Sequence, residues 1–568
     1  MRGIKIGKAA FLLVIAIALS IACEARAFEM KSYMVTMRDG ARLATDVFFP
    51  DNKKVKRPVV LIRTPYGKAK WAQIMAQAFV GQKLVWVVQD TRGRFGSEGV
   101  SSSFMDDSWD GYDTVEWIYR QPWCDGNIGT GGVSAMGITQ YVMDKTMPPH
   151  LTCQHVMAAA PSLYHTVAYQ GGAPKRALIM SWLLGNDFPL QVLQMMLSNV
   201  DYGGIWEMLD LTHEYDKVNI PIMHMAGWYD MFLKGNLDAF VGLQEGGAEG
   251  ARGNQRLVIG PWTHMGFLGV AGTKQGEIDY PGNSQYSIFK IPRWFQECLR
   301  GRDEGFMDGP VVRYYVMGDT EDPEAPGNEW RKSDVWPVAS DVTPFYMSAD
   351  GTLGEKKPGS GSKTIVDDPA NPVPTICGAN LDLKAGPCDQ RELEKRGDVL
   401  VFSTPVLEKP VEITGNIIAK IFFKTDVVDT DFAVRLTDVY PDGRSMLITD
   451  GTARASHRES DRYRVELTPG ETYELNVDLW ATSIIINKGH RIRVSVAGSN
   501  FPRFDVNMHN GRYFDINPGE LEDAAKTGKQ RKAYIHNPDL ADDARVANST
   551  VLLGGDTASH ILLPIVAD

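Results

Sequence analysis

The sequence GTGGVSAMGITQY, residues 129–141, sets a serine between a glycine-rich run and an apolar stretch. A serine on a sharp strand-to-helix turn projects its hydroxyl and can act as a nucleophile, and small neighbours let strand and helix approach closely. Glycines fit this requirement before Ser134. After it, the usual glycine position holds Met136, and glycine comes one residue later at Gly137. Taken alone, the stretch is an incomplete nucleophile motif, and a serine in a structural loop is the alternative.

Short apolar runs recur on both sides of this stretch, separated by helical patterns. Runs that are apolar at almost every position suit strands covered on both faces, so the alternation predicts a mostly parallel α/β sheet. Residues 34–50, MVTMRDGARLATDVFFP, precede the runs and predict a hairpin that turns at Asp39-Gly40. The runs themselves are PVVLIR (58–63), LVWVVQ (84–89), HVMAAAP (155–161), IPIMHMAG (220–227) and QRLVIG (255–260).

Two other regions depart from this pattern. Residues 162–219 have helical spacing and little strand character, which predicts a helical cap inserted between two sheet strands. From about residue 341, short β-rich segments alternate with turn residues, as in a sandwich or jelly roll. The expected fold is an α/β-hydrolase domain (28–161 and 220–340) with this helical cap insertion, followed by an all-β jelly-roll domain (341–568).

The first 27 residues have the features of a cleavable signal peptide. Three basic residues precede an apolar stretch at 9–22, and Ala25-Arg26-Ala27 has the small-x-small form of a signal peptidase site. The apolar stretch is short for a membrane span of about 20 residues. Cys23 raises the option of a lipoprotein, but Ser20 stands where lipoprotein signals usually carry leucine. We therefore expect a periplasmic or secreted protein, cleaved after Ala27.

Charge and cysteine content narrow the class of protein. The chain has 568 residues and a net charge of −11, and no basic run stands out, so nucleic acid is not an expected partner. Export permits disulfides. Cys377 and Cys388 bracket a short polar loop and either pair or stay free. Cys124, Cys153 and Cys298 have apolar or aromatic neighbours and are expected to be buried, unreactive thiols. No spacing indicates a zinc site.

A nucleophilic serine needs a histidine base and a carboxylate that orients the histidine. In the α/β-hydrolase fold these residues follow the chain order serine, acid, histidine, each after a strand. Asp230 follows IPIMHMAGWY and His264 follows QRLVIGPWT, so both are expected at the carboxyl ends of strands. Ser134, Asp230 and His264 are thus the expected catalytic residues. The alternative for the last two is a capping aspartate and a surface-loop histidine.

Acyl transfer also needs hydrogen-bond donors for the oxyanion. The backbone N–H of Ala135, directly after the nucleophile, is the first expected donor. The second should come from the loop after the early strand, TPYGK at 64–68, where Tyr66 offers a phenol O–H. An aromatic packing residue is the alternative reading of Tyr66.

Five motifs lie in order along the chain: RTPYGK, QDTRGRFGSEG, WCDGNIGTGGVSAMGITQY, AGWYD and GPWTH. Together they resemble the CocE/NonD hydrolases, a family that includes bacterial cocaine esterase, α-amino-acid ester hydrolases, glutaryl cephalosporin acylases and X-prolyl dipeptidyl-peptidases. The resemblance extends into the β-rich region and covers nearly all of the mature chain. It implies a glycine at Gly137 and the roles given above for the three catalytic residues and Tyr66. Family members usually carry tyrosine after the serine, so Ala135 would open the pocket.

The α-amino-acid ester hydrolases of this family hold the substrate amine with carboxylates, two of which lie just after the catalytic aspartate. This chain has Phe232 and Leu233 there, which favours an apolar acyl group. Trp182, Met195, Met196 and Trp206 of the cap either line that site or form the core of the cap, and we favour the core for most of them. We therefore expect an exported serine hydrolase that cleaves carboxylic esters of small molecules through an acyl-enzyme, without a metal or organic cofactor.

Two other functions stay open at this point. An amidase or peptidase of the β-lactam acylase or X-prolyl dipeptidyl-peptidase type would use the same residues. A binding protein with an inert hydrolase domain is disfavoured by the intact order of serine, acid and histidine. Stable membrane insertion is not expected after signal cleavage, since no second apolar stretch reaches spanning length. A homo-oligomer is compatible with the sequence.

Overall fold

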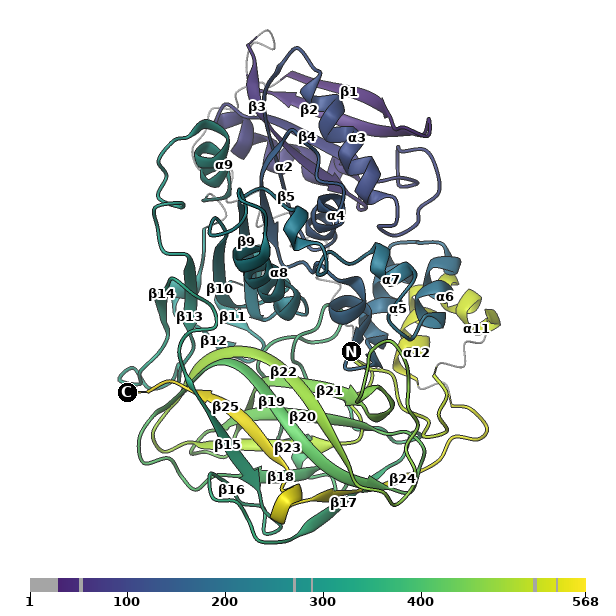
Figure 1. Cartoon of the computed structure of the whole chain (residues 1–568), viewed down its shortest axis with the longest axis vertical. Helices are drawn as coiled ribbons and strands as arrows, with labels where there is room; N and C mark the ends of the chain where they lie inside the picture. Colours follow the sequence, from purple (N-terminus) through teal and green to yellow (C-terminus); the bar gives the residue numbers. More distant parts are fainter. Residues whose placement is uncertain are drawn as a thin grey trace, which may run out of the picture.

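The computed structural model describes residues 29–50, 55–268, 272–287, 290–513, 518–537 and 540–567. The expected signal peptide lies outside these residues. Two bodies are stacked along the long axis, an α/β body on one ten-stranded sheet and a β body on two sheets (Figure 1). Within the described ranges, no helix combines the length and the apolar character that a membrane crossing requires.

The ten-stranded sheet has the order β1-β2-β4-β3-β5-β6-β9-β10-β13-β14. Neighbours from β4 to β13 run parallel, whereas β1, β2 and β14 pair antiparallel at the two edges. The prediction of a mostly parallel α/β sheet is therefore confirmed. The strands are β1 (Glu29–Thr36), β2 (Arg42–Phe49), β3 (Arg57–Thr64), β4 (Val85–Asp90), β5 (Cys124–Val133), β6 (Leu151–Met157), β9 (Ile222–Tyr229), β10 (Arg256–Thr263), β13 (Val312–Val316) and β14 (Glu329–Ser333).

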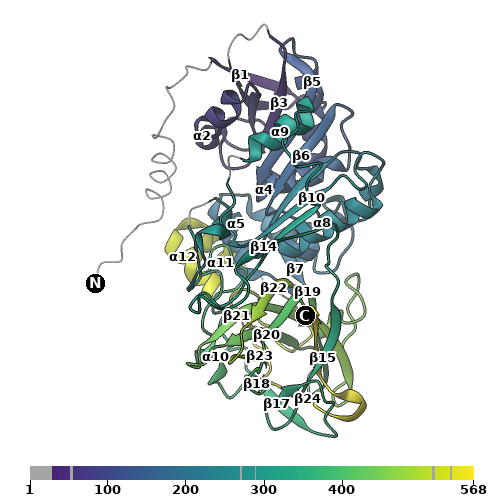
Figure 2. The ribbon, with the colours of Figure 1, turned by 90° about the vertical axis from the view of Figure 1, so that its left-hand side faces the viewer.

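Helices cover both faces of the central strands. They are α3 (Asp107–Tyr119), α4 (Ala135–Asp144) and α8 (Leu233–Gly246) on one face, and α2 (Lys68–Gly81) and α9 (Lys290–Arg300) on the other. Successive side chains of a strand point to opposite faces, so one strand contributes to two cores. Val59 and Leu61 of β3 pack in the core with α3 and α4, whereas Val60 packs in the core with α2 and α9. In Figure 2, α2 and α9 lie near each other over that second face.

The segment between β6 and β9 is mainly helical, as predicted. Its two ends are not regular α-helix. A π-helix opens the segment. Near its other end, residues 203–215 contain only one α-helix, the short α7 (Ile205–Met208), which follows Gly203 and Gly204, both with positive φ. The elements are η1 (Leu163–Ala168), β7 (Tyr169–Gln170), β8 (Ala173–Pro174), α5 (Arg176–Gly185), α6 (Leu190–Ser198), α7 (Ile205–Met208) and η2 (Tyr215–Lys217).

The β body consists of a seven-stranded and a four-stranded sheet that share one apolar core. The first sheet contains β16 (Leu353–Gly354), β15 (Asp341–Met347), β25 (His560–Ile565), β19 (Val411–Thr425), β24 (Ala547–Leu552), β17 (Ser362–Asp367) and β22 (Tyr473–Ile486). The second contains β18 (Leu400–Ser403), β23 (Arg491–Ala497), β20 (Asp431–Val439) and β21 (Ser445–Arg454).

Two late helices return to the α/β body. These are α11 (Pro518–Lys526) and α12 (Gly528–His536), which lie beside α5 (Figure 1). The buried Arg176 of α5 holds this junction, since its guanidinium lies 2.8 Å from Asp505 and donates to the Tyr534 carbonyl at 2.7 Å. The β body is thereby attached to the helical segment that covers the sheet.

The cysteine predictions are partly wrong. Cys153 and Cys298, expected to be free thiols, form a disulfide that joins β6 to α9. They are 145 residues apart, and only the packing of the helix on the sheet brings them together. Cys377 and Cys388, left open by the sequence, also form a disulfide. Cys124 is a buried free thiol, as predicted.

Candidate active site

Ser134 forms the turn between β5 and α4, with φ 62° and ψ −130°. A non-glycine residue with this backbone is strained, and the surrounding structure must hold it. The Ser134 N–H donates to the Met157 carbonyl at 3.0 Å, and the Ser134 carbonyl accepts from the Gly137 N–H at 2.8 Å. A Cβ on Gly137 would lie 2.5 Å from Cβ of Ala159, so the late glycine lets α4 pack against the chain that leaves β6.

Asp230 and His264 meet where β9 and β10 end side by side. Oδ2 of Asp230 lies 2.5 Å from Nδ1 of His264, and both side chains are buried. The other carboxylate oxygen accepts the Phe232 N–H at 2.7 Å, and the Phe232 ring packs edge-on against the imidazole. A carboxylate on Nδ1 holds the imidazole in one tautomer, which leaves Nε2 as the basic atom.

A β-bulge and a buried glutamine fix the strand end that carries His264. The register between β9 and β10 shifts between Gly260 and Thr263, and such bulges re-aim side chains beside active sites. The side-chain amide oxygen Oε1 of Gln275 accepts from the Thr263 N–H at 2.9 Å and from the Thr263 hydroxyl at 2.8 Å. Sequence reasoning missed Gln275, because nothing in its own segment signals the contact.

Tyr66 follows β3, and its hydroxyl lies close enough to the Ser134 side chain for Ser134 to influence the pKa of the phenol. The indole N–H of Trp182 donates to the Tyr66 oxygen at 2.9 Å. Burial raises the pKa of Tyr66, and the influence of Trp182 and Ser134 offsets only part of that rise. The phenol therefore stays protonated at neutral pH. Because the indole occupies its acceptor side, the phenol O–H can donate toward the space in front of Ser134.

Ala135, the other expected oxyanion donor, is the first residue of α4. Its backbone N–H belongs to the first turn, where N–H groups have no acceptor within the helix and the helix dipole favours negative charge. The Ala135 side chain is buried and lines the pocket described next.

A narrow apolar pocket opens at Ser134. Its free volume is about 30 Å³, so an acyl group can enter only if side chains move. Flexible methionines are suited to such adjustment. Of the four cap residues considered from the sequence, Trp182 and Met196 line this pocket, whereas Trp206 is buried in the core and Met195 packs against it. Leu233 is buried in α8. The lining residues are Phe104, Ser134, Ala135, Ile138, Leu163, Val167, Leu178, Ile179, Trp182, Leu183, Met196, Met231, Phe232 and Leu381.

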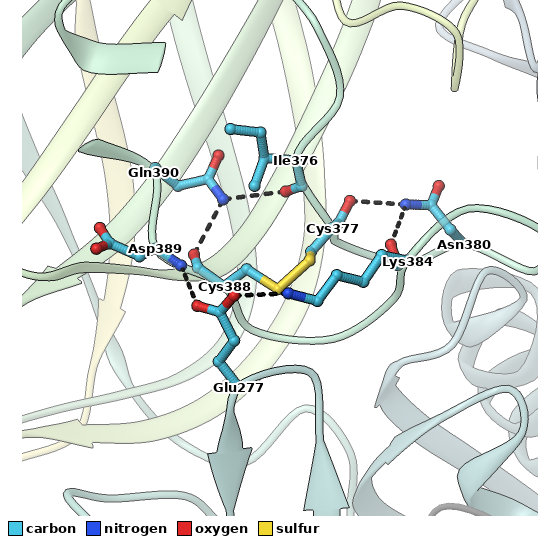
Figure 3. Close-up of a disulfide and its surroundings, with 8 residues drawn as sticks. All are labelled: Glu277, Ile376, Cys377, Asn380, Lys384, Cys388, Asp389 and Gln390. Atoms are coloured by element: carbon cyan, nitrogen blue, oxygen red, sulfur yellow. Dashed lines mark hydrogen bonds and ion pairs between the residues drawn. A yellow bond between two sulfur atoms is a disulfide. The ribbon is translucent and has the colours of Figure 1, made fainter. Parts of the chain in front are cut away.

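The Cys377–Cys388 disulfide closes a loop (Figure 3). From this loop Leu381 reaches the pocket. Three further contacts fasten the loop and its C-terminal end. Lys384 lies 2.6 Å from Glu277, which also accepts the Asp389 N–H at 3.1 Å. Glu277 follows Gln275 by two residues, so the segment that supports His264 also holds the loop. On the other side, the Ser181 hydroxyl of α5 donates to Asp382.

Replacing both cysteines of this loop, Cys377→Ala with Cys388→Ala, is expected to lower kcat/KM for an apolar ester about tenfold. The reason is that Leu381 would no longer be held in the pocket, and one apolar contact is worth about 1–3 kcal/mol of discrimination. The free energy of unfolding should fall by about 3 kcal/mol for a loop of this length. Steady-state kinetics and denaturant unfolding measure the two effects. Cys124→Ala is the control; equal kcat/KM in both variants would contradict the role of the loop.

A second cluster joins the helical segment to the β body. His165 of η1 lies 3.0 Å from the Ser162 hydroxyl through Nδ1 and 2.6 Å from Asp461 through Nε2. Burial alone would lower the pKa of His165, but hydrogen bonds with Asp210 and Asp461 outweigh it and raise the pKa. Burial would raise the pKa of Asp210, but hydrogen bonds from His165, Thr212 and Ser162 lower it to about 2.

These shifts predict opposite effects of pH on stability. The contribution of His165 is complete below its unfolded pKa of about 6.5 and is lost as pH rises through the raised folded pKa. The contribution of Asp210 is present above its unfolded pKa and is lost as pH falls toward 2. The free energy of unfolding, measured by denaturant titration between pH 5 and 9, should decline by about 0.5–1 kcal/mol, the size of a partly exposed ion pair. His165→Gln should remove this decline; an unchanged decline would exclude His165 as its source.

Comparison of the sequence with those of known proteins identifies the family of this chain. The chain is 33% identical to the cocaine esterase of Rhodococcus sp. (strain MB1 Bresler), over 94% of this chain and 98% of that protein. It belongs to the CocE/NonD hydrolase family. The resemblance inferred from the motifs is thereby confirmed. The chain is a serine hydrolase, as the esterases and S15 peptidases related to it are.

Two family models match parts of the CocE/NonD chain. The X-Pro dipeptidyl-peptidase (S15 family) model matches residues 39–191 and 184–266, a span that contains Tyr66, Ser134, Asp230 and His264. The model of the X-Pro dipeptidyl-peptidase C-terminal non-catalytic domain matches residues 304–539.

Solved structures share the fold. An aminopeptidase from a marine sediment archaeon (Thaumarchaeota archaeon) superposes with a TM-score of 0.79 at 21% identity, covering 96% of this chain and 99% of the other. An α-amino acid ester hydrolase gives 0.78 at 22% identity, covering 96% and 98%. The architecture is thus that of CocE/NonD hydrolases, an α/β-hydrolase domain followed by a β domain.

Proposed function

We propose that this protein hydrolyses carboxylic esters through an acyl-enzyme formed on Ser134. The observation that carries the proposal is the position of Ser134, strained on its turn, beside the partly buried phenol of Tyr66 and facing an apolar pocket. Phe232 lines the same pocket and packs on His264, so the buried His264–Asp230 pair adjoins it.

The proposed reaction assigns a chemical role to each residue of the site. His264 Nε2 removes the Ser134 proton as the hydroxyl oxygen attacks the ester carbonyl, and Asp230 stabilises the imidazolium that forms. The Ala135 N–H and the Tyr66 O–H donate to the oxyanion. The imidazolium then gives its proton to the leaving alcohol. Water, deprotonated by the same imidazole, releases the acid and frees Ser134.

The lining of the pocket supports an apolar acyl group. Among the described residues that line it, none carries a carboxylate that would bind a protonated amine. Phe232, in place of an acidic residue after Asp230, closes one side with an aromatic ring. An X-prolyl dipeptidyl-peptidase activity requires an anionic site for the substrate amine, so the ester reaction is favoured over the peptidase alternative.

The wider organisation is proposed on the same grounds. The helical segment 162–219 acts as a cap over the pocket, supported by Trp182 and Met196 at its lining, and the β domain from residue 341 is a jelly roll. The α/β-hydrolase domain comprises 28–161 and 220–340. Two disulfides suit an oxidising compartment, which supports export after cleavage of residues 1–27.

A matched panel of esters and amides with the same apolar acyl groups tests this function. Esters should be turned over and the corresponding amides should not, while a fluorophosphonate probe should label the wild-type protein at Ser134. Faster turnover of amides than esters would favour the acylase or peptidase alternative. If the protein neither turned over any substrate nor reacted with the probe, the result would favour a binding protein with an inert hydrolase domain.

Replacing Tyr66 with phenylalanine is expected to lower kcat by about 10²–10³, the usual cost of losing one oxyanion donor. KM should change little, because the phenol acts on the charge that develops in the transition state. Steady-state kinetics with a nitrophenyl ester measure both constants. Tyr202→Phe, which removes a buried hydroxyl bonded to Asp210 outside the pocket, is the control. Equal kcat values for the two variants would remove Tyr66 from the oxyanion hole.

A further inference from the structure

A second pocket lies where the parallel strands of the ten-stranded sheet begin, at the opposite end of these strands from the active site. Its free volume is about 170 Å³. Arg256 and Arg313, at the amino ends of β10 and β13, line it together with Lys290 and Arg293 of α9. Ser134, Asp230 and His264 instead follow the carboxyl ends of their strands. The two pockets are therefore separated by the length of the strands.

Positive charge dominates this pocket. Four cationic side chains line it against one carboxylate, Glu304, whose Oε2 lies 2.7 Å from Nε of Arg293. Arg256 donates to the carbonyls of Phe306 and Gln255, both at 2.8 Å, and so holds the wall of the pocket. Two carboxylates outside the lining, Glu297 and Asp308, interact electrostatically with Arg256. Within the described ranges, Lys290 and Arg313 have no carboxylate partner.

Lys290 and Arg313 are the cations that a ligand would meet. Nζ of Lys290 stands 4.3 Å from the centre of the Tyr286 ring, and the cross-strand partner of Arg313 is another cation, Lys332. Burial and the charges of Arg313 and Arg293 lower the pKa of Lys290. Like charges held together in a partly desolvated site repel each other. An anion that enters the site is attracted to both cations, and this attraction offsets their mutual repulsion.

We propose that this pocket binds a phosphate-type oxyanion, with Lys290 and Arg313 as its main ligands. Arg313 presents a planar fork of donors that matches two oxygens of such a group, and Lys290 adds a compact positive charge. Free inorganic phosphate and the phosphate headgroup of a lipid share this chemistry. The site does not depend on the proposed ester hydrolysis.

Isothermal titration of the intact protein with inorganic phosphate, at constant ionic strength, tests the proposal. We expect one saturable site per chain. Lys290→Gln combined with Arg313→Gln should weaken binding at least about tenfold, since each charge-assisted hydrogen bond is stronger than a neutral one. Glu304→Gln should tighten it. Lys356→Gln, an exposed cation of the β domain, is the control for net charge and should bind like the wild type.

Two further measurements complete the test. All variants should keep the wild-type rate of ester hydrolysis, which shows that they are folded. Sedimentation with phosphatidylcholine vesicles containing phosphatidic acid distinguishes the sources: binding that free phosphate competes away assigns a lipid headgroup, and no vesicle binding assigns a soluble phosphate. The proposal is overturned if the wild type shows no saturable phosphate binding, or if the double variant binds phosphate as tightly as the wild type.

Discussion

Replacing Ser134 with alanine is expected to lower kcat for a nitrophenyl ester by about a millionfold, which is the loss of an entire nucleophilic pathway. Without the hydroxyl, no acyl-enzyme forms, and what remains is the effect of the oxyanion donors on direct attack by water. The strained turn should tolerate alanine as well as it tolerates serine, because the side chains differ by one oxygen atom. Kinetics and the loss of fluorophosphonate labelling measure the effect, and thermal unfolding shows whether the fold is intact.

Ser162 provides the matched control for this experiment. It too contacts a histidine and an aspartate, since its hydroxyl lies 3.0 Å from Nδ1 of His165 and donates to Asp210 at 2.7 Å. Its proton is directed at the carboxylate rather than at a substrate, and only 2% of the residue is exposed. Ser162→Ala should therefore keep turnover near the wild-type value. Retained turnover in Ser134→Ala, with its loss in Ser162→Ala, would reverse the assignment.

The parts of this site that the sequence predicts are those determined by local pattern. Most of the buried strands are apolar at almost every position, and the residues that follow β3, β5, β9 and β10 lie at the carboxyl ends of parallel strands in one sheet. Tyr66, Ser134, Asp230 and His264 are such residues. A sequence therefore indicates which side chains lie at the carboxyl ends of the parallel strands. The direct contacts, such as that between Asp230 and His264, follow once the strand order is known.

The parts that the sequence does not predict depend on packing between distant segments. Trp182 reaches Tyr66 only because α5 folds over the turn after β3, and Gln275 supports His264 across a turn that carries no motif. Leu381 enters the pocket from the β domain, some 250 residues after Ser134. Periodicity describes one segment at a time, so such contacts leave no signal in it.

The orienting carboxylate gives the second large effect. Asp230→Asn is expected to lower kcat by about 10⁴, as happens when the acid of a catalytic triad becomes an amide. In the proposed mechanism the Asp230 carboxylate, 2.5 Å from His264 Nδ1, accepts a hydrogen bond from the N–H at that position, so that Nε2 serves as the base. An asparagine amide can donate to Nδ1 instead, which stabilises the tautomer whose proton sits on Nε2, where the base must be free.

Asp210→Asn is the control for this change, since Asp210 is also buried and also contacts a histidine, His165. Active sites are counted with a fluorophosphonate, so that a variant that unfolds more easily is still compared per folded molecule. On that basis kcat should stay within about threefold of the wild type, because Asp210 has no role in the proposed reaction. In Asp230→Asn the probe should still reach Ser134 but react far more slowly. A kcat within tenfold of the wild type would exclude Asp230 as the orienting acid and leave His264 to be held by Phe232 alone.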